Sequence, residues 1–298
     1  MNHKASPMMR RRAYWITVCA LAMLLMTLVV PTAEAGINGN VNEGGATTVV
    51  HRDQLIKWGS DQRLAMAAGG DYYIYRTVDS CGDGRGSFDP TECYKVALLC
   101  PGEAGPLVDI ERRLVRADGT MEGDWTLVGR TCRPNEVPGA AKRPTMAMII
   151  DAMHKTPWAR ARVGFQPKGN VTLVTLTNFY RASWSAAGYG PGEVDQVDPA
   201  TMYGYRVDIR PTLIGLTYRF GDGASYGPTR SLGGVYPDGD VRHAYAAAGK
   251  YAVSVSVQWG ADFRVNGGSW AQIPDTVTVQ QPATTVTVRT ATNRLVTR

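Results

Sequence analysis

Histidine is scarce in this chain of 298 residues, which contains only four. Three of them, His51, His154 and His243, follow residue 35, and none belongs to a recognisable catalytic triad. The sequence also has no G-x-S-x-G nucleophile elbow, no H-E-x-x-H zinc motif, no phosphate-binding P-loop and no dinucleotide fingerprint. These absences argue against the common classes of enzyme, and we expect no catalytic residue and no cofactor.

Apolar runs of membrane-spanning length are also missing, apart from one at residues 13–30. Three arginines at positions 10–12 precede this run, Pro31 ends it, and Ala33-Glu34-Ala35 follows. This three-part pattern predicts a cleaved signal peptide over residues 1–35. An uncleaved anchor is the alternative, because the run is just long enough to span a bilayer. In both cases we expect a secreted or cell-envelope protein, with no membrane span left after cleavage.

A clustered basic stripe is the third feature that the chain lacks. The signal segment holds four of the 32 Lys and Arg residues and one of the 26 Asp and Glu residues. The remaining chain therefore has 28 basic and 25 acidic residues, a net charge of +3. Nucleic-acid binding requires a concentrated basic surface, so we expect no nucleic-acid partner.

Cysteine is rare, and four of the five cysteines lie in one stretch after the signal segment. An even number in an exported chain predicts two disulfides, and four cysteines allow three pairings. We favour Cys81 with Cys93 and Cys100 with Cys132, because the second pair would join the ends of a hairpin formed by 107–116 and 125–131. Zinc is the alternative, but the spacing contains no C-x-x-C and no histidine is near.

Acidic residues are dense in the same stretch, where Asp79, Asp83, Asp89 and Glu92 occur. Carboxylate-pair catalysis is the one enzymatic route that the missing motifs leave open. These residues lie in a Gly-rich loop that a disulfide is expected to close, so we interpret them as solvated rather than catalytic.

Hydrophobic periodicity divides the chain into helical and extended parts. Met146, Ile149, Ile150 and Met153 have helical spacing, which predicts a core-packed helix over 145–154. From residue 164 onward the period is two, as in the alternating run 251–259. The expected fold is mainly β. Residues 36–70 are expected to be a mobile mature N-terminus with a short helix at 53–68, and residues 71–140 a four-cysteine β-rich module that opens with a strand at 72–77. Residues 141–163 are expected to be a linker and short helix, residues 164–282 an antiparallel β-sandwich whose strands include a hairpin at Asn266-Gly267, and residues 283–298 a C-terminal strand and tail.

Three sequence segments in this last part follow one another in a known order. They are Tyr218-Arg219-Phe220-Gly221-Asp222-Gly223, His243-Ala244-Tyr245 and Gly249-Lys250-Tyr251-Ala252-Val253. Together they resemble the signature of the polycystic kidney disease (PKD) domain, over about residues 216–257. The resemblance implies an immunoglobulin-like sandwich, with 171–180 as the upstream strand, and an insertion at 181–207 departs from the pattern. The ending FRVNGGSW to TVTV is similar to that of exported actinobacterial proteins carrying this domain.

The signature residues have a structural interpretation that needs no ligand. Two glycines suit a sharp turn, and the Asp222 carboxylate can accept hydrogen bonds from nearby backbone N–H groups. Calcium is the alternative, with Asp222, Asp238 and Asp240 as oxygen donors, although no complete calcium loop surrounds them. We expect Tyr245 to pack beside Tyr251 and His243 to satisfy a buried polar group. The signature residues are Phe220, Gly221, Asp222, Gly223, His243, Tyr245, Gly249 and Tyr251.

Two function classes remain after these exclusions. The first is a non-catalytic module that binds an extracellular protein or a cell-wall glycan, as the PKD resemblance implies. Its expected contact surface is Trp184, Tyr189 and Tyr203, because exposed aromatic side chains stack on sugars or anchor protein partners. Alternatively, Trp184 simply covers the sandwich edge. The second class is a structural spacer or assembly component of a surface complex, and a hydrolase is the least favoured.

Export provides the first test. If residues 1–35 are a cleaved signal, N-terminal sequencing of the protein from culture medium should begin at or within a few residues of Gly36. Intact Met1 in washed membranes would instead show an anchor.

Overall fold

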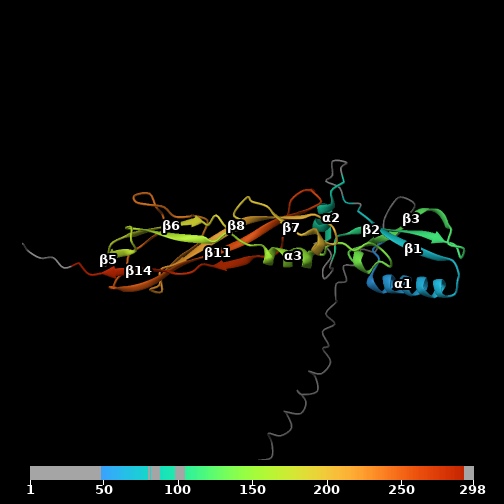
Figure 1. Cartoon of the computed structure of the whole chain (residues 1–298), viewed down its shortest axis with the longest axis horizontal. Coiled ribbons are helices and arrows are strands. Elements are labelled where there is room, and N and C mark those ends of the chain that lie inside the picture. Colours follow the sequence, from blue (N-terminus) through green and yellow to red (C-terminus); the bar gives the residue numbers. More distant parts are fainter. Residues whose placement is uncertain (1–47, 80, 82–87, 98–104, 292–298) are drawn as a thin grey trace, which may run out of the picture. The chain divides into compact units, whose positions relative to one another are not determined.

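The computed structural model describes residues 48–79, 81, 88–97 and 105–291 (Figure 1). The predicted signal peptide, the mature N-terminus up to residue 47, Asp83, Cys100 and the end of the predicted tail at 292–298 lie outside these residues. The described part is mainly β, as the sequence predicts, and its strands are joined by three α-helices and two 3-10 helices.

A helix and a three-stranded antiparallel sheet form the first part of the described chain. Trp58 of the helix stacks on Tyr75 of the sheet with ring centroids 5.1 Å apart, and Leu55 is buried in the same small core. The helix predicted over 53–68 is therefore confirmed, and it is a packed element rather than part of a mobile N-terminus. The elements are α1 (Arg52–Ala67), β1 (Tyr72–Val78), β2 (Val108–Val115) and β3 (Met121–Thr131), with strand order β1-β2-β3.

The predicted strand at 72–77 and the predicted hairpin are also present. The β2–β3 turn is closed by the Arg116 N–H, which donates to the Thr120 carbonyl at 2.8 Å, and Gly119 adopts a φ of 84°. The second strand of the hairpin begins earlier than predicted, since Met121 already pairs with Val115.

The disulfide between Cys81 and Cys93 is present and links the chain after β1 to α2 (Pro90–Ala97). Cys132 is buried and disulfide-bonded, and its predicted partner Cys100 lies outside the described residues. On α2, Tyr94 meets Phe263 edge to face at 5.6 Å and belongs to the large core of the C-terminal part. The boundary predicted at residue 140 therefore does not separate two cores, because the four-cysteine segment contributes to both.

The helix predicted over 145–154 is confirmed as α3 (Met146–Lys155). Thr145 caps it, since its Oγ1 accepts a hydrogen bond from the Met148 N–H at 3.2 Å. Ile149 and Met153 are fully buried in the large core, so the methionine stripe is packing, as predicted. A short helix, η1 (Pro134–Glu136), lies between β3 and α3.

Strands of two sheets, together with α2 and α3, contribute side chains to the large core. The smaller one has strand order β10-β6-β4, and the larger one has the path β5-β14-β11-β8-β7 with β9, β12 and β13 beside it. The strands are β4 (Ala161–Gln166), β5 (Val171–Leu173), β6 (Asn178–Trp184), β7 (Asp195–Val197), β8 (Val207–Arg219), β9 (Ser225–Thr229), β10 (Arg242–His243), β11 (Gly249–Val265), β12 (Ala271–Gln272), β13 (Val277–Gln280) and β14 (Thr284–Arg289).

Strands β8 and β11 pair along most of their length, from Ser254 with Arg219 to Val265 with Val207 (Figure 1). The alternation predicted for 251–259 is confirmed, because Val253, Val255, Val257 and Trp259 are all buried. The predicted hairpin after β11 is also present: Asn266 and Gly267 adopt φ values of 49° and 81°, as a tight two-residue turn requires.

The single strand predicted over 171–180 is wrong, because the chain changes sheets inside this run. β5 runs parallel to β14 in the larger sheet, whereas β6 pairs with β4 and β10 in the smaller one. The crossing occurs at Thr175, which has a φ of 65° and whose N–H donates to the Tyr245 carbonyl at 2.9 Å. One continuous strand cannot lie in both sheets.

Two further segments differ in detail from the sequence-based expectation. The insertion predicted at 181–207 contains the end of β6, the strand β7 and a short helix η2 (Pro199–Met202). The strand expected in the tail after residue 283 is β14, whose Val286 and Val288 are buried in the large core. This strand is therefore part of the two-sheet body.

The Cys81–Cys93 link should stabilise the fold measurably. Replacing both cysteines by serine should lower the free energy of unfolding by about 2–4 kcal/mol, because the bridge restricts the unfolded chain. Denaturant melts of the double variant and the wild type measure this, and thiol titration of the exported protein should find no free thiol. Identical melts, or bound zinc with reduced thiols, would contradict the assignment.

Candidate functional site

The turn after β8 is formed by Gly221 and Gly223, which adopt φ values of 86° and 95°. A side chain on Gly221 is also excluded by space, because a Cβ there would lie 2.6 Å from the backbone nitrogen of Ala252 on β11. Both the backbone conformation and the close approach therefore require glycine at residue 221.

Asp222 lies in this turn and is held by two hydrogen bonds. One oxygen accepts from the Ala224 N–H at 3.1 Å, and the other lies 2.7 Å from Nε2 of His243. Burial acts to raise the pKa of Asp222, but these hydrogen bonds outweigh it and hold the pKa below its ordinary value. The stabilisation is therefore present above the ordinary pKa and is lost as the pH falls through the lowered pKa.

The aromatic residues of the signature form one stack behind the turn. The His243 ring lies parallel to Phe220, with centroids 4.3 Å apart, and meets Tyr245 edge to face at 4.7 Å. Tyr245 stacks on Tyr251 at 4.4 Å, as predicted. The Tyr245 hydroxyl donates to the Phe220 carbonyl at 3.1 Å and lies 3.0 Å from the hydroxyl of Tyr180.

Burial raises the pKa of both Tyr180 and Tyr245, so these hydroxyls stay neutral near neutral pH. Gly249 begins β11, two positions before Tyr251, and a Cβ there would lie 3.4 Å from that tyrosine's ring. The signature residues thus meet in one cluster whose polar atoms bond to each other and to the backbone. The cluster's chemistry is that of a structural core.

The three aspartates of the calcium alternative have separate surroundings. Asp222 bonds to His243, Asp240 accepts from the Ser231 hydroxyl at 2.8 Å, and Asp238 is exposed. Within the described ranges, no group of three or more His, Cys, Asp or Glu side chains is placed to hold a metal ion.

The three aromatic residues of the predicted contact surface are not equally accessible. Trp184 packs against Trp259 in the core at 5.1 Å, which favours the interpretation that it covers the sandwich edge. Tyr189 is half-buried and its backbone pairs with that of Trp158. Tyr203 alone of the three is exposed, at 52%.

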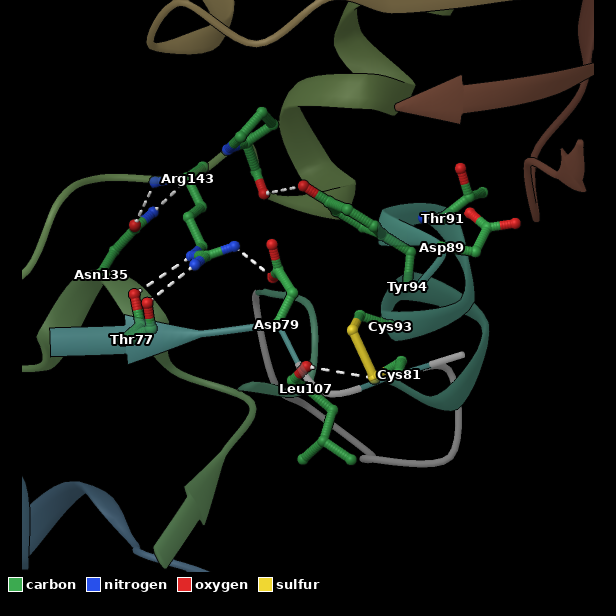
Figure 2. A network of polar contacts seen from close by, with 11 residues as sticks. Thr77, Asp79, Cys81, Asp89, Thr91, Cys93, Tyr94, Leu107, Asn135 and Arg143 are labelled. Atoms are coloured by element: carbon green, nitrogen blue, oxygen red, sulfur yellow. Dashed lines mark hydrogen bonds and ion pairs between the residues drawn. A yellow bond between two sulfur atoms is a disulfide. The ribbon is translucent and has the colours of Figure 1, made fainter. Parts of the chain in front are cut away.

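The acidic residues after β1 have partners that the sequence did not reveal. Figure 2 shows Arg143 between Thr77, Asp79 and Asn135. Its guanidinium pairs with Asp79 and donates to the Thr77 carbonyl at 3.0 Å, while the Asn135 side chain bonds to the Arg143 backbone at 2.8 and 2.9 Å. Arg143 is buried, so this network fixes the linker before α3 to the end of β1.

Asp89 caps α2 and joins it to the hairpin after β11. Its carboxylate accepts from the Thr91 N–H at 2.9 Å and from the Ser269 N–H at 2.7 Å. Burial acts to raise the pKa of Asp89, but its hydrogen bonds to Ser269 and Thr91 hold it below the ordinary value. Glu92 accepts from the Ser269 hydroxyl at 2.8 Å and pairs with Lys95. Asp79, Asp89 and Glu92 are therefore bonded within the fold, and the interpretation of them as solvated is wrong.

An open groove of about 840 Å³ lies at the edge of the two-sheet body. One wall contains Arg160, which directly precedes β4, and Arg162 and Val163 at the start of β4. The other wall is the connection between β13 and β14, including Gln281 and Pro282. Both arginines are exposed, and none of the described residues that line the groove is acidic. Sequence reasoning missed this groove because its walls are far apart along the chain.

Comparison with models of known protein families finds no match for this chain, and comparison with curated proteins finds none. Among the described residues, no helix has the length and apolar character needed to cross a membrane. The apolar run at 13–30 lies outside those residues. The PKD resemblance therefore depends on the signature residues of the sequence alone.

Replacing Asp222 separates a structural role from calcium binding. The Asp222→Ala variant should lose about 1–3 kcal/mol of stability, because it removes hydrogen bonds at the end of a core strand. The loss should be the same in chelator and in millimolar calcium. Asp238→Ala is the matched control, since that aspartate is exposed, and it should change stability by less than about 0.5 kcal/mol.

Thermal and denaturant melts of both variants and the wild type provide the measurement. A wild type that calcium stabilises, beside an Asp222→Ala variant that it does not, would overturn the structural interpretation.

Proposed function

We propose that this chain is a secreted or envelope-associated, non-catalytic binding protein whose C-terminal body is a PKD-like, immunoglobulin-type β-sandwich. Its partner is an extracellular protein or a cell-wall glycan. The PKD resemblance and the export signal suggest this class. The groove at the sheet edge is the observation that best supports this binding function.

The signature cluster supports the sandwich assignment. Phe220, His243, Tyr245 and Tyr251 form one stack that fastens the turn after β8 to the start of β11. This is what a fold-defining signature is expected to do, because its side chains interact with one another rather than with a ligand. Binding is therefore expected elsewhere on the body.

The groove has the character of a contact surface. Arg160 and Arg162 have no ion pair within the described part of the chain, and both are exposed where they line the groove. Exposed cations with no acidic neighbour in a concave surface attract an anionic partner. We therefore propose this groove as the contact surface, in place of Trp184, Tyr189 and Tyr203.

A structural spacer is the second candidate, and the buried networks favour it. Asp89 fastens α2 to the hairpin after β11, and Arg143 fixes the linker before α3 to the end of β1. Such links suit a protein that holds other components at a fixed separation.

Binding to envelope fractions distinguishes these functions. Immobilised mature protein should retain a component from either purified cell-wall glycan or the extracellular protein fraction. The Arg160→Glu/Arg162→Glu variant should bind about tenfold more weakly, because it reverses two contact charges. Lys168→Glu/Lys250→Glu is the control, since it makes the same charge change at exposed positions outside the groove.

Retention by neither fraction would favour the spacer. Equal binding by the wild type and the arginine variant would place the contact elsewhere. Release of soluble sugars or peptides from either fraction would instead indicate a hydrolase.

A further inference from the structure

Strand β4 is the last strand of the smaller sheet, and one of its edges has no partner strand among the described residues. The Ser185 N–H donates to the Arg160 carbonyl at 2.7 Å, which shows that this backbone carbonyl points toward β6. On β6, the N–H groups of Tyr180 and Ala182 bond away from β4, to the carbonyls of Val241 and Leu232.

Antiparallel pairing alternates the direction of backbone groups along a strand. Arg162 pairs with Ser183 just as Arg160 bonds to Ser185, so the backbone groups of both arginines point toward β6. The backbone N–H and C=O of Val163, one position later, therefore point outward from the sheet. Val163 lines the groove. The wall formed by β4 therefore offers the hydrogen-bonding pattern that another strand can extend.

The opposite wall is irregular and cannot offer such a pattern. Gln280 pairs with Ser256 and Thr284 pairs with Val253, so three residues of the connection oppose two of β11. This is a β-bulge, and its central residue, Pro282, has no N–H to donate. An added strand would thus pair with β4 and would contact the bulge only through side chains.

The charge of the groove selects the partner's side chains. Arg160 directly precedes β4, and its backbone bonds to Ser185 just as Arg162 pairs with Ser183, so the two arginine side chains point to the same face. In an added strand, residues directly opposite have Cβ atoms about 4.5–5.5 Å away, where opposite charges attract. A segment with acidic residues at alternate positions matches this spacing.

The described lining of the groove offers no exposed aromatic ring on which a sugar could stack. Trp158 is the aromatic residue among these lining residues, but it is 9% exposed and its ring stacks on Trp259 at 5.5 Å. Its face is therefore not available to a sugar ring. Gln281 also lines the groove, and its buried side-chain amide nitrogen has no hydrogen-bond partner.

From these observations we propose that the groove binds an extended acidic segment of a partner protein, which adds to β4 as a strand. This inference depends on the proposed binding function and narrows the partner to a polypeptide. The edge strand supplies backbone hydrogen bonds, and Arg160 and Arg162 select alternating carboxylates.

A short synthetic peptide in which Glu alternates with Val is the probe, and NMR titration of the full mature protein is the measurement. The peptide should shift the backbone amide signals of residues 161–165. Binding should weaken about tenfold in the Arg160→Glu/Arg162→Glu variant and on raising salt from low to high concentration. Lys168→Glu/Lys250→Glu should bind like the wild type, and all three proteins should have the same melting temperature.

Two altered peptides separate the backbone from the charge contribution. A peptide with Lys in place of Glu should not bind, and one with N-methyl groups on the edge that faces β4 should bind at least about tenfold more weakly, because it loses strand pairing. Undiminished binding of the N-methylated peptide, shifts confined to residues outside the groove, or no binding at millimolar peptide would overturn the inference.

The two proposals fail in different ways. If the peptide does not bind but cell-wall glycan binds and the arginine variant abolishes it, the strand inference is wrong and the binding function stands. If neither envelope fraction nor the peptide binds, both are wrong.

Discussion

The antiparallel pairing of β8 with β11 is the constraint on which the rest of the two-sheet body depends. β11 also pairs with β12, β13 and β14, and β8 also pairs with β7 and β9. The buried face of these two strands supplies Trp259, Phe263 and Tyr218 to the core. Each such side chain contributes about 1.5–3 kcal/mol when it is fully buried, so the pairing and the core stabilise each other.

The polar groups at both ends of this pair of strands are bonded within the fold. At one end, Asp222 and His243 hold the turn that follows β8. At the other, Asp89 binds the backbone of the hairpin that follows β11, where a Cβ on Gly268 would lie 2.1 Å from the Asp89 carboxylate. Because these conspicuous residues are used to build the fold, the binding surface that we propose lies at the sheet edges, which β4 and the Pro282 bulge expose.

Much of the fold could be predicted because local patterns encode it. The alternation from Val253 to Trp259 indicates a strand with one buried face, and the spacing of Ile149 and Met153 indicates a packed helix. The break at Thr175 could not be predicted, because the run around it reads as continuous strand and the change of sheet depends on a bond to Tyr245.

The candidate site was harder to predict from the sequence, for a related reason. Asp89 and Ser269 are 180 positions apart, and the groove brings Arg162 together with Gln281. No local spacing records such contacts, since they arise only when the sheets have formed. The aromatic residues chosen from the sequence, Trp184 above all, were conspicuous because they are large, and Trp184 owes its position to the core.

Backbone amide hydrogen exchange of the mature protein tests most directly whether the body has a free edge for binding. We predict that the Val163 amide exchanges orders of magnitude faster than that of Val257, which lies between β8 and β13 in the larger sheet. Equal protection of Val163 and Val257 would show that another part of the chain already covers β4, and would contradict the account.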